Sequence, residues 1–239
     1  MVKNDLLGYP KYIIYQDPKM FSFSIDSMLL ADFVKVKTTT KKIIDLGTGN
    51  AVIPMYLTLS TNAHIIGVDI QEDVLKLAQM SVSENNLDDQ ITLIHKDIKG
   101  ISDTFKDFDI VVSNPPYFKY KETSIVNQTD YKTIARHEVF ITLEALIEEA
   151  YKLLKPKGSL YLVHKPDRLT DVLSYLRKHK LEPKTIRFVY PKKNTKPNHV
   201  LFEARKDAKE GNLIVLEPLY IYEAGKWTEE ILKIYNKGR

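Results

Sequence analysis

The alternation of short apolar runs with amphipathic segments from about residue 24 to residue 182 constrains the fold of this chain most strongly. The runs are continuous and rich in Ile and Val, which is typical of strands in a parallel sheet covered on both faces. The predicted strands are Lys42–Leu46, His64–Ile70, Ile91–His95, Phe108–Ser113 and Ser159–Val163. Strands that alternate with helices require right-handed crossovers, so the sequence predicts a doubly wound α/β domain.

Four amphipathic segments between these strands are predicted as helices, each with an apolar face at helical spacing. Ser24 and Thr142 are the expected N-caps of the first and the third, and Pro156 and Gly158 end the third. The apolar faces are Ile25, Leu29, Leu30, Phe33 and Val34; Val74, Leu75, Ala78 and Val82; Leu143, Leu146, Ile147, Ala150, Leu153 and Leu154; and Leu169, Val172, Leu173 and Leu176.

After residue 182 the pattern changes. Thr185–Tyr190 and His199–Ala204 are strand-like with no helix between them, so an antiparallel hairpin is expected. The tail is expected to add a strand pair, Ile214–Leu216 and Tyr220–Tyr222, and a helix over Trp227–Tyr235.

Composition limits the function classes. The chain has 239 residues and no cysteine, which excludes disulfides and thiolate metal sites, and its six histidines lack metal-ligand spacing. The first ten residues are too polar for a signal peptide, and no apolar run has the roughly 20 residues that a membrane span needs. A cytoplasmic protein without a membrane partner or a metal is therefore expected.

The net charge of +4 permits a polyanionic partner without requiring one. Basic residues gather late in the chain, where they suit either RNA phosphates or a solvated, lysine-rich loop. They are Lys192, Lys193, Lys196, Arg205, Lys206 and Lys209.

A glycine turn follows the first predicted strand, in the sequence Ile43 to Gly49. Gly47, Thr48 and Gly49 stand where open α/β sheets bind ligands, and glycine lets a ligand approach the backbone closely. Asp45 precedes the first glycine by two residues and favours a cofactor site over a plain tight turn. Ala51 stands where a third glycine often follows.

Two further acidic residues stand at the ends of strands: Asp69 ends the second predicted strand and Asp97 follows the third. Asp69, 20 residues after Gly49, suits a carboxylate that binds both hydroxyls of a ribose, although it could instead cap the next helix. Asp97 suits either the amino group of a cofactor adenine or an ordinary turn. Ile70 and Ile98, the residues that follow them, are also expected at the cofactor.

Asn114, Pro115, Pro116 and Tyr117 end the fourth predicted strand. An amino group conjugated to a purine ring is a weak nucleophile, because its lone pair is delocalised. The Asn114 side-chain carbonyl and the Pro115 backbone carbonyl can accept its two hydrogens, and the two prolines stiffen the segment. Tyr117 offers a face on which a base can stack, worth roughly 1–3 kcal/mol. The alternative, a rigid strand-ending turn, does not explain the acidic positions and the glycine turn upstream.

These motifs resemble those of amino-methyltransferases with an Asn-Pro-Pro-Tyr motif, and among them the bacterial tRNA(Val) adenine-N6 methyltransferases. The resemblance is carried by Phe21–Ala31, by Asp45–Asn50 with Val52–Pro54, and by Asn114–Phe118 with Ala135–Glu138. It implies a class I methyltransferase Rossmann-like fold, a mostly parallel seven-stranded sheet with a C-terminal antiparallel hairpin. It also implies S-adenosylmethionine as cofactor and the adenine 3′ of the anticodon, position 37 of tRNA(Val), as substrate.

The expected organisation is an N-terminal cap segment over residues 1–40, a methyltransferase core over 41–206, and a strand pair and helix over 207–239. A monomer is favoured. Residues 118–137 are predicted to form a lid over RNA, the alternative being a solvated linker. The residues expected at the substrate are Tyr117, Phe118, Lys119, Lys121, Arg136, Lys192 and Lys193.

Other functions remain open from the sequence. The same motif serves methylation of a release-factor glutamine, a guanine in rRNA or an adenine in DNA. About 40 residues before the first strand are too few for the helical domain that release-factor enzymes usually carry. A catalytically silent RNA-binding module would not explain the cofactor motifs. A nicotinamide oxidoreductase would not explain the motif Asn114–Tyr117.

Overall fold

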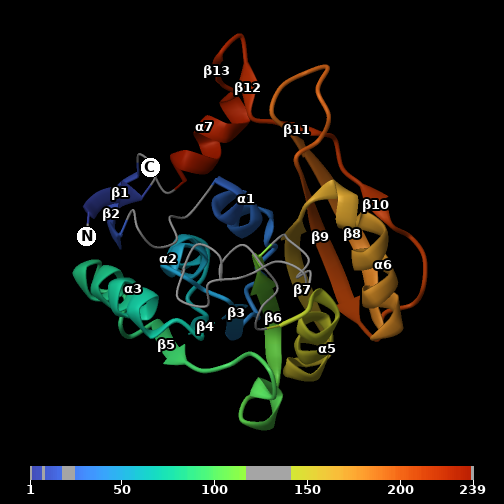
Figure 1. The fold of residues 1–239 in the computed structure, drawn as a ribbon, viewed down its shortest axis with the longest axis horizontal. Coiled ribbons are helices and arrows are strands. Elements are labelled where there is room, and N and C mark those ends of the chain that lie inside the picture. Colours follow the sequence, from blue (N-terminus) through green and yellow to red (C-terminus); the bar gives the residue numbers. More distant parts are fainter. Residues whose placement is uncertain (1, 7–8, 18–24, 117–140, 238–239) are drawn as a thin grey trace, which may run out of the picture.

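The computed structural model describes residues 2–6, 9–17, 25–116 and 141–237. It has one large sheet with helices on both faces and two small hairpins (Figure 1). The expected N-cap Ser24 lies outside the described residues. Thr142 does cap its helix, because its side chain accepts a hydrogen bond from the Ala145 amide at 3.2 Å.

Among the described residues, the large sheet has nine strands: the seven expected in the methyltransferase core, several with longer bounds, and two short strands from the tail. Its order is β10-β8-β9-β7-β6-β3-β4-β5, with β11 also paired to β8. The seven strands are β3 (Lys42–Leu46), β4 (His64–Asp69), β5 (Ile91–His95), β6 (Phe108–Ser113), β7 (Leu154–His164), β8 (Leu181–Tyr190) and β9 (His199–Lys206).

β9 is the antiparallel strand of this sheet. It lies between β7 and β8 and pairs antiparallel with both, whereas β3 to β7 pair parallel with one another. The expected mostly parallel sheet with a late antiparallel hairpin, the arrangement of a class I methyltransferase, is therefore confirmed.

Alternate residues of the central strands enter two separate apolar cores. Ile43 packs with one face of helices and Ile44 with the other, as continuous apolar strands require. One core contains residues of α1 (Ile25–Phe33), α2 (Val52–Thr58), α3 (Glu72–Glu84) and α7 (Glu229–Tyr235). The other contains residues of α5 (Leu143–Leu153), α6 (Leu169–Lys178) and the short helix η1 (Ile101–Asp103). A second short helix, η2 (Pro166–Arg168), leads into α6.

The N-terminal residues form a hairpin that the sequence pattern does not reveal. β1 (Val2–Leu6) pairs antiparallel with β2 (Tyr9–Gln16), and the hairpin is fixed to α3. The Ile13 amide donates to Asn85 Oδ1 at 2.9 Å, and Asn85 Nδ2 donates back to the Ile13 carbonyl at 2.7 Å. The N-terminal hairpin is therefore anchored to the end of α3.

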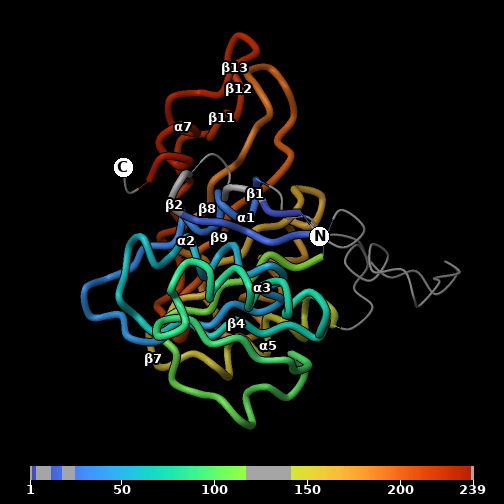
Figure 2. The backbone as a smooth tube through the Cα atoms, turned by 90° about the vertical axis from the view of Figure 1, so that its left-hand side faces the viewer, coloured from blue at the N-terminus to red at the C-terminus, as the bar shows by residue number. Residues whose placement is uncertain are grey.

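The tail departs from the expected strand pair. β10 (Ile214–Val215) and β11 (Leu219–Tyr220) do not pair with each other, because both add parallel to β8. A separate hairpin follows, β12 (Tyr222–Glu223) and β13 (Lys226–Trp227). α7 then packs against α1, and the Tyr56 hydroxyl donates to the Ile234 carbonyl at 2.8 Å. Figure 2 shows β11, β12, β13 and α7, in red, gathered at one end of the molecule.

None of the helices within the described ranges is long and apolar enough to cross a membrane.

Candidate functional site

The candidate site lies where the strand order of the large sheet reverses. β3 has β4 on one side and β6 on the other, so the carboxyl ends of β3 and β6 diverge into crossovers on opposite sides. Ser113 at the end of β6 donates its hydroxyl to the Leu46 carbonyl at 2.8 Å. This bond holds Asn114 beside the glycine turn that follows β3.

The glycine turn adopts backbone conformations that favour glycine. Gly47 has φ 75° and Gly49 has φ 53°, and the amides of Gly47 and Thr48 both donate to the Val68 carbonyl at 2.9 Å. A Cβ on Gly47 would meet no atom within 4 Å, so its open side faces free space. Ala51, in the place of a third glycine, also has a positive φ of 58° and is completely buried.

A pocket lies between this turn, the start of α2, α1 and Asn114. Its lining contains polar groups suited to a ligand with both donors and acceptors. Within the described part of the chain, the Thr48 hydroxyl and both polar atoms of the Asn50 side chain are buried without a hydrogen-bond partner. The lining residues are Ser27, Gly47, Thr48, Gly49, Asn50, Val52, Ile53 and Asn114.

Asp45 lies behind the glycine turn and is 0% exposed. Neither carboxylate oxygen has a hydrogen bond of good geometry from the described residues. Burial raises the pKa of Asp45 to about 7, and the nearby Thr48 hydroxyl opposes that rise. A buried carboxylate in this state favours a cationic ligand, because such a ligand stabilises its ionised form.

Asp69 ends β4 with its carboxylate held by two backbone amides. Oδ2 accepts from Gly49 at 2.8 Å and Oδ1 accepts from Gln71 at 2.9 Å. Burial raises the pKa of Asp69, and these backbone hydrogen bonds oppose the rise. Each carboxylate oxygen retains capacity for a second donor, so the group can accept from a ribose. The same carboxylate does not cap α3, whose N-cap is Gln71.

The remaining expected cofactor residues follow β4 and β5 at the same sheet edge. Asp97 accepts from the Lys99 amide at 2.9 Å and so forms a turn. The Ile70 carbonyl lies 2.9 Å from His95 Nε2, and Ile98 packs half-buried against the second apolar core. The structure thus brings Asp45, Asp69 and Asn114 around one turn and places Asp97 two strands away.

Asn114 is oriented by the first turn of α1. Its Nδ2 donates to Ser27 Oγ at 2.9 Å and to Asp26 Oδ2 at 3.3 Å. Pro115 is buried and Pro116 is half-buried. The other residues expected at the substrate in this part of the chain lie outside the described residues, as does the segment 118–137. They are Tyr117, Phe118, Lys119, Lys121 and Arg136.

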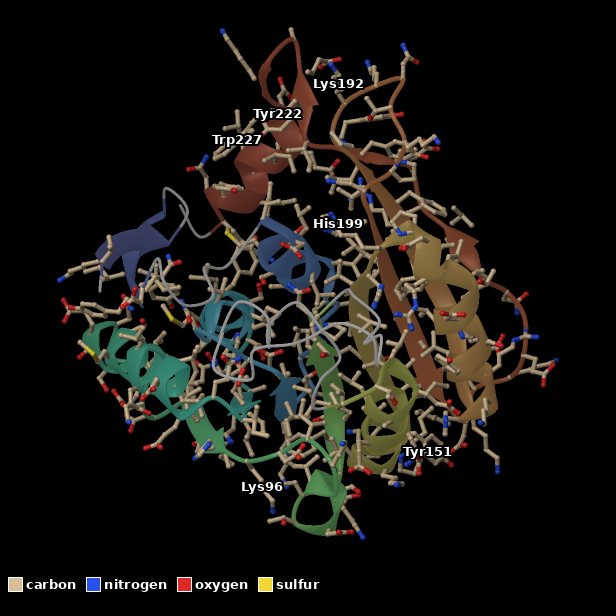
Figure 3. All side chains as sticks on the ribbon, in the orientation of Figure 1. Lys96, Tyr151, Lys192, His199, Tyr222 and Trp227 are labelled. Carbon is tan, nitrogen blue, oxygen red and sulfur yellow. The ribbon has the colours of Figure 1, made fainter. Side chains whose placement is uncertain are left out.

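Lys192 and Lys193 are exposed in the loop from β8 to β9, and Figure 3 shows Lys192 at its outer end. Lys193 forms an ion pair with Glu223 at 2.8 Å. The basic stretch is not one patch, because Arg205 and Lys206 lie at the far end of β9. Strand direction separates charges that are close in sequence.

Four residues of the pocket lining were not singled out from the sequence as cofactor ligands, although all four stand inside segments that carry the resemblance. They are Ser27, Asn50, Val52 and Ile53. No group of three or more His, Asp or Glu in the described ranges is arranged to hold a metal ion.

Comparison with known proteins supports the same fold. A methyltransferase from Phocaeicola vulgatus, described as tRNA1(Val) (adenine(37)-N6)-methyltransferase, is 29% identical over 199 residues, which cover 83% of this chain and 82% of that protein. A protein of the same description from Dyadobacter fermentans is 25% identical over 227 residues, 93% of this chain and 91% of its own.

Among solved structures, a predicted O-methyltransferase from Agrobacterium tumefaciens superposes with a TM-score of 0.71 at 19% identity, covering 89% of this chain and 96% of that chain. A geranyl diphosphate methyltransferase in complex with SAM gives a TM-score of 0.57 at 12% identity, covering 76% and 84%. These two likenesses show the fold. The model of the methyltransferase small domain matches residues 11–179, well over half of the chain, and the protein therefore belongs to that family.

Proposed function

We propose that this protein transfers a methyl group from S-adenosylmethionine to the exocyclic N6 amino group of an adenine in tRNA. The observation that carries the proposal is the placement of Asn114 in the lining of the glycine-turn pocket, next to the bond from Ser113 to Leu46. The Asn114 amide carbonyl at a cofactor pocket, together with the backbone carbonyl of the next residue, Pro115, suits an amino group that must be held for attack. Relatives named for tRNA adenine methylation support the choice of substrate.

The cofactor residues each have a defined task in this proposal. Asp69 accepts hydrogen bonds from the ribose hydroxyls, and the glycine turn lets the cofactor lie close to the backbone. Asp45 provides negative charge behind the turn, and Asp97 with Ile70 and Ile98 contacts the adenine of the cofactor. The cofactor supplies an electrophilic methyl group on a sulfonium centre.

Methyl transfer to nitrogen needs alignment more than a strong base. Asn114 Oδ1 and the Pro115 carbonyl would accept the two amino hydrogens and hold the nitrogen lone pair in position for attack, and the methylated nitrogen would then release one of these hydrogens to solvent as a proton. Positioning and fixed dipoles then supply most of the rate. Tyr117 is proposed to stack on the target base, with Phe118, Lys119, Lys121 and Arg136 contacting the RNA around it.

The proposed RNA surface also includes the loop with Lys192 and Lys193. It leaves the carboxyl end of β8, a strand that runs in the same direction as β6, so the loop and Asn114 lie at the same edge of the sheet. The proposed target is the adenine at position 37 of tRNA(Val), as in the names of the relatives. A monomer in the cytoplasm, where tRNA is modified, completes the proposal.

The test is methyl transfer from labelled S-adenosylmethionine to total tRNA that lacks the modification, followed by nucleoside analysis. The protein is expected to form N6-methyladenosine, and Asn114→Ala is expected to abolish it. Asn236→Ala is the matched control, because Asn236 caps α7 and hydrogen-bonds only to the Leu232 carbonyl among the bonds the structure gives its side chain. It is expected to retain full activity.

Label in a release factor, rRNA or DNA instead of tRNA would retain the fold and cofactor and replace the substrate. Equal loss of activity in Asn114→Ala and Asn236→Ala would contradict the proposed catalytic role of Asn114.

A further inference from the structure

The two hydrogen bonds between Asn114 and α1 determine which way the amide faces. Ser27 Oγ at 2.9 Å and Asp26 Oδ2 at 3.3 Å are both acceptors, so the NH₂ end of Asn114 faces them. Oδ1 therefore points away from α1. An amide that is free to flip would present its donor rather than its acceptor to an amino group for part of the time.

Asp26 belongs to a buried polar cluster that joins four elements of the fold. It is 2% exposed, and its Oδ2 lies 3.8 Å from His199 Nε2 at the start of β9. The same His199 nitrogen lies 2.9 Å from Lys165 Nζ, which follows the end of β7. Figure 3 shows His199 toward the centre of the molecule, between α1 and the upper end of the sheet. The cluster thus connects Asn114, through Asp26, to the start of β9 and the end of β7.

The charges in this cluster are set by burial. Burial lowers the pKa of His199 to about 4, assisted by the charge of Lys165, so the ring is neutral at pH 7 and accepts from the Lys165 ammonium. Burial likewise lowers the pKa of His164 to about 4, assisted by Arg168, and His164 Nδ1 accepts from the Lys165 amide at 2.8 Å. Lys165 is then the cation whose charge acts on Asp26, and although burial lowers the pKa of Lys165, the negative charges of Asp26 and Asp167 oppose that fall.

Asp26 itself is subject to opposing effects. Burial raises the pKa of Asp26, whereas the hydrogen bond from Asn114, its own and the Ser27 backbone amides, and the positive charge of Lys165 lower it. The ionised form of Asp26 is therefore favoured mainly by the hydrogen bond from Asn114 and by the backbone amides, and additionally by the charge of Lys165.

We propose that Asp26 and Ser27 are positioning residues that fix the Asn114 amide for catalysis, and that Lys165 and His199, which lie on the other side of Asp26, favour its charged form. The inference deepens the proposed function, because it rests on Asn114 holding the amino group. When the amino nitrogen attacks, positive charge develops on it. An anion behind Asn114 polarises the amide so that Oδ1 becomes a stronger acceptor for the amino hydrogens.

A purely structural role for Asp26 is the alternative. It stands in the first turn of α1, where a carboxylate stabilises a helix through the exposed amides and the helix dipole. That role predicts a loss of stability when Asp26 is changed. It does not predict a change in the pH dependence of the reaction.

The test compares Asp26→Asn with Asp32→Asn. Asp32 is on the same helix, but its carboxylate contacts the Tyr56 hydroxyl and Lys237 instead. Single-turnover methyl transfer is measured with saturating protein and S-adenosylmethionine across pH. Asp26→Asn is expected to slow transfer by between about tenfold and a hundredfold, with cofactor and tRNA affinities within about twofold. Asp32→Asn is expected to retain the parental rate.

The pH profile separates positioning from stability. In the parent, the rate is expected to fall as pH drops through the raised pKa of Asp26, and Asp26→Asn is expected to lose that acid limb. Lys165→Gln is expected to move the limb to higher pH, because it removes the cation that favours ionised Asp26. A parental rate and profile in Asp26→Asn would overturn the inference.

Two further results decide the remaining cases. If Asp26→Asn does not fold, Lys165→Gln provides the answer, and an unshifted acid limb in that variant overturns the inference. If the parent methylates an amino group other than tRNA adenine, the proposed substrate fails, and the same variants are measured on that substrate. The inference then stands or falls separately.

Discussion

At the scale of single residues, Asp45 combines complete burial with an ionisable group. Its pKa of about 7 predicts that affinity for S-adenosylmethionine rises between about pH 6 and pH 8, because the ionised carboxylate attracts the cationic cofactor. Calorimetric titration of the protein with cofactor measures this. Asp45→Asn is expected to bind the cofactor more weakly and without the pH dependence. If that variant shows the same pH dependence of affinity as the parent, a group other than Asp45 causes it.

The same residue predicts a pH dependence of stability in the absence of cofactor. The unfolded chain ionises Asp45 near its ordinary pKa of about 3.9, whereas the folded chain holds the proton up to about pH 7. Between these values the folded state binds more protons, so the contribution of Asp45 to stability falls as pH rises. Asp45→Asn is expected to unfold at a higher temperature than the parent at about pH 8 and to match it near pH 4. A lower melting temperature of Asp45→Asn than of the parent at pH 8 would contradict the raised pKa of Asp45 in the folded protein.

Sequence motifs predicted the positions of Asp45, Asp69 and Asn114 because each lies at, or within one residue of, the end of a buried strand. They did not predict the role of Asp26 or Ser27, because those residues contact Asn114 only through the packing of α1 against the sheet. Periodicity along the chain contains no information about a contact made across 87 or 88 residues.

At the scale of elements, β4 supports the glycine turn through Gly67. A Cβ there would lie 2.8 Å from Thr48 Oγ1 and 2.8 Å from Leu93 Cδ2. Gly67→Ala is therefore expected to displace Thr48, to destabilise the fold by about 1–3 kcal/mol and to weaken cofactor binding. Denaturant unfolding and calorimetric titration measure the two effects.

Gly158→Ala on β7 is the matched control, since its Cβ would lie 2.9 Å from Leu154 Cδ2 and 3.0 Å from the Lys155 carbonyl. It is expected to destabilise the fold similarly while cofactor affinity stays at the parental value. Equal loss of affinity in both variants would show that overpacking acts through general destabilisation rather than through Thr48.

Elements with strong periodicity were predictable, and those without it were not. α2 is buried at six of its seven positions, so it shows no polar face from which a helix could be inferred. β10 and β11 have two residues each, and their pairing with β8 depends on the preceding hairpin being in place. Long-range pairing of this kind is not encoded in a local pattern.

At the scale of the whole molecule, the positive net charge and the loop from β8 to β9 predict salt-sensitive tRNA binding. Each phosphate contact releases counterions, so the affinity falls as salt rises. Lys192→Ala is expected to reduce the slope of log affinity against log salt by about 1. Lys106, exposed just before β6 at the opposite edge of the sheet, provides the control. Replacement of Lys106 by Ala is expected to leave the slope unchanged. An equal change of slope in both variants would contradict an RNA surface localised at the loop from β8 to β9.

The layout of the whole sheet was largely predictable, because strand–helix alternation and right-handed crossovers permit few topologies. The basic stretch was harder to interpret, since β9 carries Arg205 and Lys206 away from the loop that holds Lys192. Basic residues that are close in sequence can be assigned to one charged surface only when the directions of their strands are known.

The position of β9 between β7 and β8 also has a consequence for synthesis. As the chain leaves the ribosome, β3 to β7 can assemble while β8 still has no neighbour, because the strand that separates it from β7 is made after it. A nascent chain that stops near Tyr190 would expose the edge of β7 and an unpaired β8, both open to pairing with other chains. Release of residues 199–206 therefore closes the sheet, and His199, which contacts Lys165, comes into place in the same step.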